Sequence, residues 1–208
     1  TITVTDNESA STITLTTSSD TIVENSTSVV LRATIGTATY QDVTVSLDGT
    51  GGTATEGTDF GTVSDITISA GATTGSTLFT VTDDSIYDAT SNETAGISVS
   101  AVSGGGASEN GDQSVTITIT DNESAPTLTL STSATSIAED AGSSLTLTAT
   151  LSNGTYQDVT AALGTSGTAI EGTDYTDGSG NIDDITISAG NTTGTVSFTP
   201  TDDSIDEG

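Results

Sequence analysis

The stretch VVLRATI, residues 29–35, alternates apolar and polar side chains along its whole length. In an extended chain, successive side chains point to opposite faces, so its four apolar residues at every second position would share one face. Arg32 would lie on the opposite face. The stretch therefore predicts a half-buried β-strand whose Arg32 faces solvent.

The same alternation recurs on both sides of this stretch. Six further segments of the first half have it: STITLTTS (11–18), VTVSL (43–47), DITIS (65–69), TLFTV (77–81), GISVSAV (96–102) and SVTITIT (114–120). They are rich in β-branched residues, and Gly, Asn, Asp and Ser separate them, which favours strands joined by turns. Seven such segments without a helical period predict an all-β sandwich of antiparallel strands.

The second half of the chain repeats the plan of the first. TYQDVT begins at residues 39 and 155, EGTDF at 56 returns as EGTDY at 171, ITISAG begins at 66 and 185, and TDDSI begins at 82 and 201. A unit of about 115 residues has the size of a whole sandwich domain. We therefore predict three parts. Residues 1–10 would be the last strand of a preceding repeat plus a linker, 11–123 a complete sandwich, and 124–208 a second sandwich lacking its final strands.

The charge balance narrows the classes of partner. One Lys or Arg stands against 29 Asp and Glu, for a formal net charge of -28, and the sequence contains neither His nor Cys. Such a surface argues against nucleic acid and anionic membranes, and no apolar run is long enough to predict membrane insertion in this segment. Without His or Cys, the acids alone make a poor catalytic set, so we expect no enzyme. Cations are the natural counterpart.

The acids are expected to gather at one end of the sandwich. Because consecutive strands reverse direction, the first, third and fifth connections and the exit from the seventh strand would lie at the same end. That end collects eight residues with side-chain oxygen: Glu24, Asp59, Asp83, Asp84, Asp88, Asp121, Asn122 and Glu123. Carboxylates about 5 Å apart repel by roughly 3 kcal/mol per pair at an effective dielectric near 20, and a divalent cation reverses that sign. An all-oxygen set on loops favours Ca²⁺, with Mg²⁺ as the weaker alternative.

One acidic heptapeptide occurs twice, after an alternating segment each time. VTDNESA occupies residues 4–10 and ITDNESA occupies 119–125, which makes Asp6 and Glu8 the counterparts of Asp121 and Glu123. We therefore include Asp6 and Glu8 among the candidate metal ligands.

Several of these acids have a simpler interpretation. Asp59 and Asp174 would also be explained as turn caps in GTDF and GTDY. The pairs Asp83–Asp84 and Asp202–Asp203 would also be explained as solvated turns after a strand. Both interpretations stay open from the sequence.

The order of motifs resembles the Calx-beta module. The matching residues are the Glu of TIVEN and of SIAED, the segments GTATEGTDF and GTAIEGTDY, both ITISAG segments, and TDDSIYD and TDDSIDEG. The resemblance covers residues 11–208 and implies tandem immunoglobulin-like antiparallel β-sandwiches that bind Ca²⁺ at the end formed by the first, third and fifth connections.

Carried over residue by residue, the resemblance implies two ligand sets. The first copy would supply Glu24, Asp59, Asp83, Asp84 and Asp88, and the second copy Glu139, Asp174, Asp202, Asp203 and Glu207. Calcium-sensing members of the family often have a third consecutive Asp, where this chain has Ser85 and Ser204. We expect a lower ion count or a weaker affinity, in the range of about 10⁻⁴ to 10⁻³ M typical of extracellular modules.

These features predict a calcium-binding, calcium-rigidified repeat segment of a large extracellular or cell-surface bacterial protein, an adhesin or a matrix or filament component. Its partners would be neighbouring repeats of the same chain. Three alternatives stay open. The first is a self-assembling extracellular filament subunit, in which strand exchange through residues 1–6 completes another copy of the chain. The second is a glycan- or protein-binding adhesin module using a loop such as GGGASENGD (104–112). The third is a set of cadherin-like repeats, although the spacing of GTDF and TDDSI favours Calx-beta.

Overall fold

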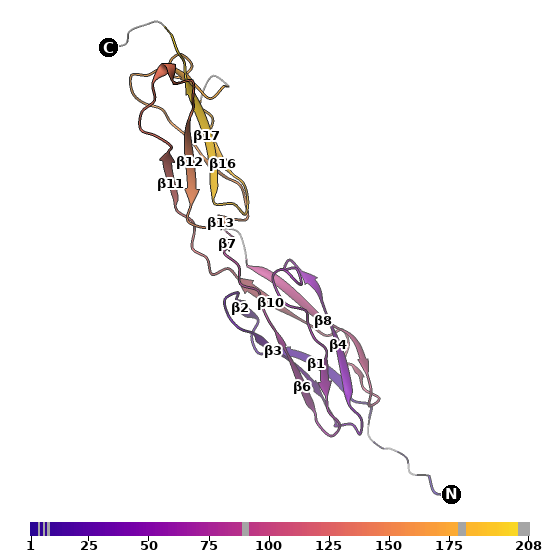
Figure 1. The fold of residues 1–208 in the computed structure, drawn as a ribbon. Coiled ribbons are helices and arrows are strands. Elements are labelled where there is room, and N and C mark those ends of the chain that lie inside the picture. The colour runs from indigo at the N-terminus through magenta and orange to yellow at the C-terminus, as the bar shows by residue number, and fades with distance from the viewer. Residues whose placement is uncertain (4, 6, 8, 89–91, 179–181, 204–208) are drawn as a thin grey trace. The chain divides into compact units, whose positions relative to one another are not determined.

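The computed structural model describes residues 1–3, 5, 7, 9–88, 92–178 and 182–203. The chain divides into two compact units, which are described separately. Unit 1 comprises Thr1–Asp84 and Thr90–Asn122, and unit 2 comprises Ser85–Ala89 and Glu123–Gly208. In Figure 1, unit 1 runs from indigo to magenta and most of unit 2 from orange to yellow.

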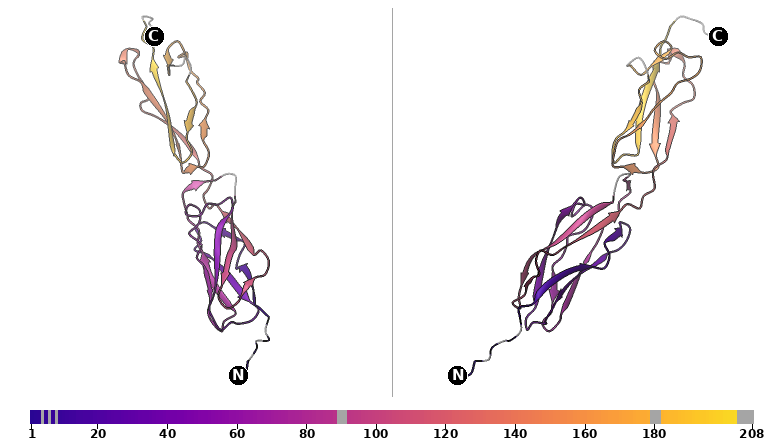
Figure 2. Two further views of the ribbon diagram at one scale, coloured as in Figure 1. Left: turned by 90° about the vertical axis from the view of Figure 1, so that its right-hand side faces the viewer. Right: turned by 180° about the vertical axis from the view of Figure 1, so that it is seen from behind.

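Unit 1 is a two-sheet sandwich. One sheet has the strand order β6-β3-β1-β9 and the other β2-β10-β8-β4-β5. Its strands are β1 (Thr12–Thr17), β2 (Thr21–Val23), β3 (Val29–Ile35), β4 (Val43–Gly52), β5 (Ile66–Ile68), β6 (Thr74–Phe79), β8 (Glu93–Ser103), β9 (Ser108–Glu109) and β10 (Ser114–Thr120). Each of the seven predicted segments overlaps a strand, and the predicted all-β class is confirmed. The two layers are visible in Figure 2.

The core of unit 1 lies between its two sheets. The alternating residues of β3 are buried, and Arg32 is exposed, as predicted. Buried side chains from both sheets form one continuous cluster, which includes Ile13 and Leu31 from the first sheet and Ile97 and Ile117 from the second. Apolar side chains at every second position therefore stabilise the sandwich. Burial contributes roughly 1.5 to 3 kcal/mol of folding free energy for each fully buried Val, Leu, Ile or Phe.

The segment GGGASENGD is more ordered than a simple loop. It contains β9, which pairs in parallel with β1 through Thr12↔Ser108 and Ile13↔Glu109. Two backbone bonds reinforce the pairing, from Ser108 N to Ser11 O and from Asn110 N to Ile13 O. The alternation pattern did not indicate this strand because two residues are too few to show a period.

Unit 2 repeats part of this architecture. Its sheets have the orders β11-β12-β17-β15, β14-β16 and β13-β7. Its elements are β7 (Ile86–Tyr87), β11 (Leu128–Thr132), the 3-10 helix η1 (Glu139–Ala141), β12 (Leu145–Leu151), β13 (Gly154–Thr155), β14 (Val159–Ala161), β15 (Tyr175–Thr176), β16 (Ile185–Ile187) and β17 (Thr193–Pro200). No helix among the described residues is long and apolar enough to cross a membrane.

The core of unit 2 is smaller. Leu128 and Leu130 are 44% and 52% exposed, whereas Leu15, the counterpart of Leu130, is 6% exposed in unit 1. In unit 1 this position belongs to the core cluster, to which β8 contributes Ile97 and β10 contributes Ile117. The 208 residues contain no second copy of the segments that form those two strands. The predicted boundaries at residues 10 and 123 stay predictions.

The first residues of the chain form no strand where they are described. Thr1, Ile2, Thr3 and Thr5 are assigned to no sheet, and Ile2 is 93% exposed. The predicted last strand of a preceding repeat also includes Val4 and Asp6, which lie outside the described residues.

A close approach between β5 and β6 gives the first testable prediction. A Cβ added at Gly75 would lie 2.8 Å from Ile66 Cγ2 and would also meet the Thr67 carbonyl oxygen; Gly194 of unit 2 is in the same position against Thr186. We expect Gly75→Ala to lower the free energy of unfolding by about 1 to 3 kcal/mol, because the backbone must shift to admit the methyl group. Urea unfolding of the full chain measures this loss.

The matched control is Gly36→Ala. An added Cβ at Gly36 meets no atom within 4 Å, and its φ is not positive. This variant should keep or slightly raise the urea midpoint. A Gly75→Ala midpoint equal to that of Gly36→Ala would contradict the prediction.

Candidate metal site

Strand pairing brings several connections of unit 1 to one end of the sandwich. β10 pairs in parallel with β2, through Ile119↔Ile22 and Thr120↔Val23, and Glu24 N continues the ladder with a 3.1 Å bond to Thr120 O. β8 begins at Glu93, opposite Ile119, and β4 ends opposite the third residue of β8, through Gly52↔Ala95. The connections after β2 and β4, the start of β8 and the exit of β10 therefore share this end.

The register also sets the direction of two acidic side chains. Ile22 and Ile119 are buried in the core. Glu24 and Asp121 follow them by two positions, so their side chains emerge on the same face of the sheet. Both carboxylates are half-buried at the rim, where the core opens at the end of the sandwich.

Three carboxylates meet at this rim. Glu24, Asp121 and Glu123 each offer an oxygen, and the three oxygens lie within 4.8 Å of one another. All three residues are half-buried, and Glu123 Oε2 is shielded from solvent. Ca²⁺ binds oxygen at about 2.3 to 2.6 Å, so two oxygens on one ion lie at most about 5 Å apart. The spacing of the three oxygens is therefore short enough for all three to share one calcium ion.

Asn122 ties the same two segments together. Its Oδ1 accepts a 3.0 Å hydrogen bond from Asn25 N. The amide thus joins the residue after Glu24 to the residue after Asp121, which helps to keep both carboxylates in place. Asn122 acts here as a positioning residue.

Asp59 and its counterpart in the second copy, Asp174, have the same structural role. Its Oδ2 accepts a 2.6 Å bond from Thr55 N, and Asp174 Oδ2 accepts the same bond from Ile170 N. The interpretation of these residues as turn caps is therefore supported. Asp59 O also accepts from Thr82 N at 2.9 Å, which places the Asp59 turn beside the start of the Asp83–Asp84 pair.

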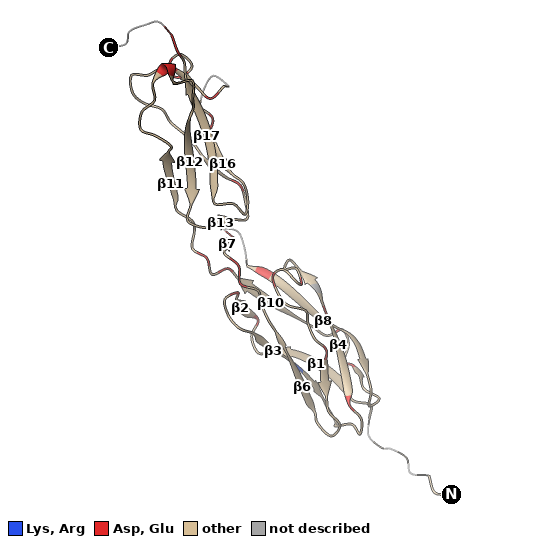
Figure 3. Ribbon diagram, in the orientation of Figure 1, with Lys and Arg blue, Asp and Glu red and all other residues tan. Residues whose placement is uncertain are grey.

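The other predicted ligands are dispersed. Among the described residues, the group of mutually close acids contains Glu24, Asp121 and Glu123 and none of Asp59, Asp83, Asp84 and Asp88. Asp83, Asp84, Asp202 and Asp203 are exposed, Asp88 is half-buried in unit 2, and Glu139 is half-buried in η1. Asp6, Glu8 and Glu207 lie outside the described residues. As Figure 3 shows, the acids concentrate in connections rather than within strands.

One acidic residue at this end was absent from the sequence prediction. Glu93 is half-buried at the start of β8, directly opposite Ile119. The sequence prediction began this strand at Gly96. The signal was present, because the alternation of Ile97 and Ala95 extends back to Glu93 and places it on the core-facing side at the rim.

Substitution of Asp59 separates its role in the turn from metal binding. Asp59→Ala removes the acceptor for Thr55 N, and we expect it to cost about 1 kcal/mol of stability even in chelator. Asp59→Asn keeps an oxygen acceptor and should cost much less. Urea unfolding of both variants in chelator measures the difference, and equal losses would contradict the role of the Asp59 carboxyl group as a cap.

Comparison with known proteins agrees with this architecture. The family profile described as the Calx-beta domain matches residues 6–123 and again residues 121–208. No curated protein sequence matches the chain significantly.

Several solved structures are similar to the chain. The apo form of the Calx CBD1 domain has 20% identity and a TM-score of 0.46, with 55% of this chain and 99% of that chain covered. CBD12 from CALX1.2 has 20% identity and a TM-score of 0.44, with 89% and 73% covered. The calcium binding domain CBD12 of CALX1.1 has 19% identity and a TM-score of 0.45, with 88% and 73% covered. The two consecutive profile matches span nearly the whole chain, and from them we conclude that this chain belongs to the Calx-beta domain family.

Proposed function

We propose that this chain is a calcium-binding structural segment of a large extracellular or bacterial cell-surface protein, an adhesin or a matrix or filament component. Calx-beta domains bind calcium in sodium/calcium exchanger homologues, and the chain contains two of them in tandem. The observation that carries the proposal is that the carboxylates of Glu24, Asp121 and Glu123, which follow β2 and β10, lie close together.

The donor set suits calcium better than the common transition metals. The three side chains provide carboxylate oxygens only, and the chain has no His or Cys. Hard cations such as Ca²⁺ prefer oxygen ligands, whereas Zn²⁺ and Cu²⁺ prefer imidazole or thiolate. Glu24, Asp121 and Glu123 would hold the ion, and the Asn122 amide would keep two of them in register. The ion would supply positive charge that offsets their mutual repulsion.

Such an ion would stiffen the path of the chain after β10. Glu24 belongs to the connection after β2, while Asp121 and Glu123 belong to the residues that leave β10. A shared ion would tie the start of that exit to unit 1 and so reduce its freedom to rotate. A segment that extends another domain away from a cell needs this stiffness, and for that reason we favour a structural role.

The chemistry of the chain supports an extracellular setting and a non-enzymatic role. Calcium sites with about 10⁻⁴ to 10⁻³ M affinity are filled at extracellular calcium levels. Ser85 and Ser204 stand where calcium-sensing relatives often have a third Asp, which is consistent with such modest affinity. Calx-beta is a family of regulatory calcium-binding domains, and the sequence offers neither His as a general base nor Cys as a nucleophile, which supports a non-enzymatic role.

Small-angle X-ray scattering of the full chain tests the mechanical part of the proposal. In calcium, the distribution of interatomic distances should become narrower and its maximum dimension larger than in chelator. Asp121→Asn should give the chelator profile under both conditions. Identical wild-type profiles with and without calcium would overturn the stiffening role while leaving calcium binding itself to be measured by calorimetry.

A further inference from the structure

The dipeptide Asn-Gly occurs twice in the sequence, once in each unit. Asn110–Gly111 lies in the segment GGGASENGD of unit 1, and Asn153–Gly154 lies in unit 2. An Asn followed by Gly can lose its side-chain nitrogen without an enzyme, because a glycine has no side chain to hinder close approach to its backbone nitrogen. In a folded protein, the rate depends on how the carboxamide and that nitrogen are held.

Both reacting groups are accessible at Asn110–Gly111. The two residues are exposed, and Gly111 has a φ of 67°. Within the described part of the chain, neither the Asn110 carboxamide nor Gly111 N makes a hydrogen bond. A Cβ added at Gly111 meets no atom within 4 Å, so the space beside Gly111 N is open to the Asn110 side chain.

The backbone of Asn110, in contrast, is held on both sides. Asn110 N donates to Ile13 O at 3.2 Å, and Asn110 O accepts from Gln113 Nε2 at 2.7 Å. Gln113 is itself fixed, because its N donates to Glu109 Oε1 at 2.5 Å and its Oε1 accepts from Leu15 N at 3.3 Å. The Gln113 amide therefore points at the oxygen of the peptide group that joins Asn110 to Gly111.

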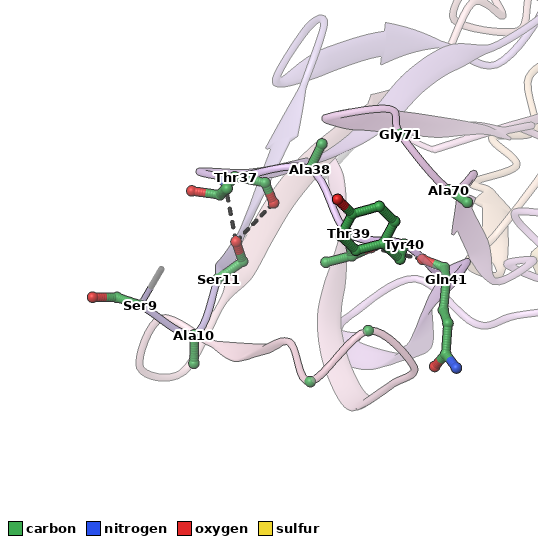
Figure 4. A pocket seen from close by; sticks show the side chains of 12 residues that line it. Ser9, Ala10, Ser11, Thr37, Ala38, Thr39, Tyr40, Gln41, Ala70 and Gly71 are labelled. Atoms are coloured by element: carbon green, nitrogen blue, oxygen red, sulfur yellow. Dashed lines mark hydrogen bonds between the residues drawn. The ribbon is translucent and has the colours of Figure 1, made fainter. Parts of the chain in front are cut away.

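The strand that leads into this turn is anchored at its start. Ser108 N donates to Ser11 O at 3.0 Å. Ser11 is buried, and its Oγ donates to Thr37 O at 2.7 Å and accepts from Thr37 N at 3.1 Å (Figure 4). The turn at Asn110 therefore leaves a segment that is tied to the start of β1, while its own side chain stays accessible.

We propose that Asn110–Gly111 is a self-modification site at which Asn110 is deamidated without an enzyme. In the first step, hydroxide removes the proton from Gly111 N, which attacks Asn110 Cγ. A C–N bond forms, and the side-chain nitrogen takes a proton from water and leaves as ammonia. In the second step, water adds to one of the two carbonyl groups of the cyclic imide and opens the ring. Opening at one carbonyl gives aspartate, and opening at the other gives isoaspartate.

The Gln113 amide promotes the first step. When Gly111 N loses its proton, the negative charge is shared with Asn110 O, because resonance joins the two atoms of the peptide group. A donor that already points at this oxygen stabilises the charge as it develops. Gln113 is thus a positioning residue that makes the Gly111 nitrogen a better nucleophile through its 2.7 Å bond to Asn110 O.

Asn153–Gly154 is held in a way that opposes the same reaction. Asn153 Nδ2 donates to Ser124 O at 3.3 Å, and Asn153 Oδ1 accepts from Ser152 Oγ at 3.0 Å. Gly154 is buried in β13, which pairs with β7 through Gly154↔Ile86. The carboxamide must break two hydrogen bonds and the backbone must leave the strand pair before Gly154 N can reach Asn153 Cγ. The structure therefore separates two sites that share the same dipeptide.

Deamidation at Asn110 changes the edge of a sheet. β9 is the outermost strand in the order β6-β3-β1-β9, and the reacting pair follows it directly. Each conversion adds a negative charge between Glu109 and Asp112, and isoaspartate also lengthens the main chain between β9 and β10 by one methylene carbon. Both changes weaken the pairing of β9 with β1. Because the reaction is irreversible, the altered fraction increases with the age of the protein.

The first experiment compares the two sites in the full chain at mildly alkaline pH. Fragmentation of the intact chain in a mass spectrometer locates each replacement of an amide nitrogen by oxygen. In the folded chain, Asn110 should convert at least tenfold faster than Asn153. In concentrated urea the two rates should become similar, because the dipeptide is the same. Similar rates in the folded chain would overturn the proposal. A difference that persists in urea would also overturn it, since neighbouring sequence and not the fold would then be the cause.

The second experiment tests the role of Gln113. Gln113→Glu keeps an oxygen that can accept from Leu15 N but removes the donor to Asn110 O, so conversion at Asn110 should slow at least threefold. Exchange of the Gly111 N–H passes through the same deprotonated peptide group, and NMR should show that it slows by a similar factor. If Gln113 only held the loop in place, its substitution would speed up this exchange. Faster exchange, or unchanged conversion at Asn110, would overturn the role of Gln113.

The matched control is Ser114→Glu. Ser114 is exposed at the start of β10, so this variant adds the same charge one residue away and keeps the Gln113 donor. It should convert at Asn110 at a rate close to that of the wild type. Equal slowing in Ser114→Glu and Gln113→Glu would mean that added charge, and not the loss of the hydrogen bond to Asn110 O, controls the reaction.

Discussion

Calcium is expected to raise the unfolding temperature of unit 1 by about 5 to 10 °C at a concentration of about 10 mM. At an affinity of about 10⁻⁴ to 10⁻³ M, this concentration stabilises the folded state by roughly 1.4 to 2.7 kcal/mol. For a domain of slightly more than 100 residues, each 1 kcal/mol shifts the melting temperature by roughly 4 °C. Differential scanning calorimetry in calcium and in chelator measures the shift.

The variant Asp121→Asn should remove most of that shift. It keeps the shape of the side chain but removes a charged ligand from the group formed with Glu24 and Glu123. In chelator, the same variant should be at least as stable as the wild type, because one of three mutually repelling carboxylates is neutral. The substitution should therefore lower stability in calcium but not in chelator, and this difference is specific to a metal site. Substitution of an Asp with a purely structural role would lower stability in both conditions.

Asp112→Asn is the matched control. Asp112 is exposed and precedes β10, whereas Asp121 follows it, so the two lie toward opposite ends of that strand. The substitution makes the same change in net charge. Asp112→Asn should therefore keep the full calcium shift. An equal loss of the shift in both variants would mean that calcium acts through the net charge of the chain and not at the rim.

The strands could be predicted from the sequence because most of them are buried on one face. VVLRATI has the burial pattern that its alternation indicates, and this one-sided burial is what fixes the register of a strand. β2 and β7 have only three and two residues, and their partners are far away in the sequence. Local alternation carries no information about such short strands, because the distant partner decides whether they form.

The candidate site was predictable only in part, for a related reason. Chain reversal was enough to bring Glu24 and Asp121 to the same end, and the parallel pairing of β2 with β10 makes them neighbours. The use of the Asp59 carboxylate as a turn cap depends on a backbone N–H four residues earlier, and the sequence left this role open. Local hydrogen bonds thus decide which acids are available to an ion, and topology decides which acids can meet.

The second large effect concerns the aromatic pair in the core of unit 1. Phe60 and Phe79 are 0% and 1% exposed, and their ring centroids lie 5.0 Å apart. Phe60 follows the cap residue Asp59, and its ring lies against Gly49, where an added Cβ would be 3.1 Å from Phe60 Cε2. The Phe60 ring therefore packs between the backbone at Gly49 and the ring of Phe79.

Phe60→Ala should lower the free energy of unfolding of unit 1 by about 3 to 5 kcal/mol, because it removes a fully buried ring and leaves a cavity against Phe79. The corresponding pair in unit 2, Tyr175 and Phe198, has its centroids 5.6 Å apart, but both rings are only half-buried. Tyr175→Ala should therefore cost unit 2 clearly less, because water already reaches that ring. Amide hydrogen exchange in urea follows each unit separately and measures both losses.

Leu78→Ala provides the control for the loss of a large apolar side chain, taken from β6, the strand that contains Phe79. Leu78 precedes Phe79 in β6 and is 55% exposed, so its removal should change the stability of unit 1 by less than about 0.5 kcal/mol. A loss at Leu78 as large as the loss at Phe60 would mean that local strand propensity, and not burial between the two sheets, stabilises this sandwich. If the ordering is Phe60 first, Tyr175 second and Leu78 last, stability follows how completely each side chain is buried.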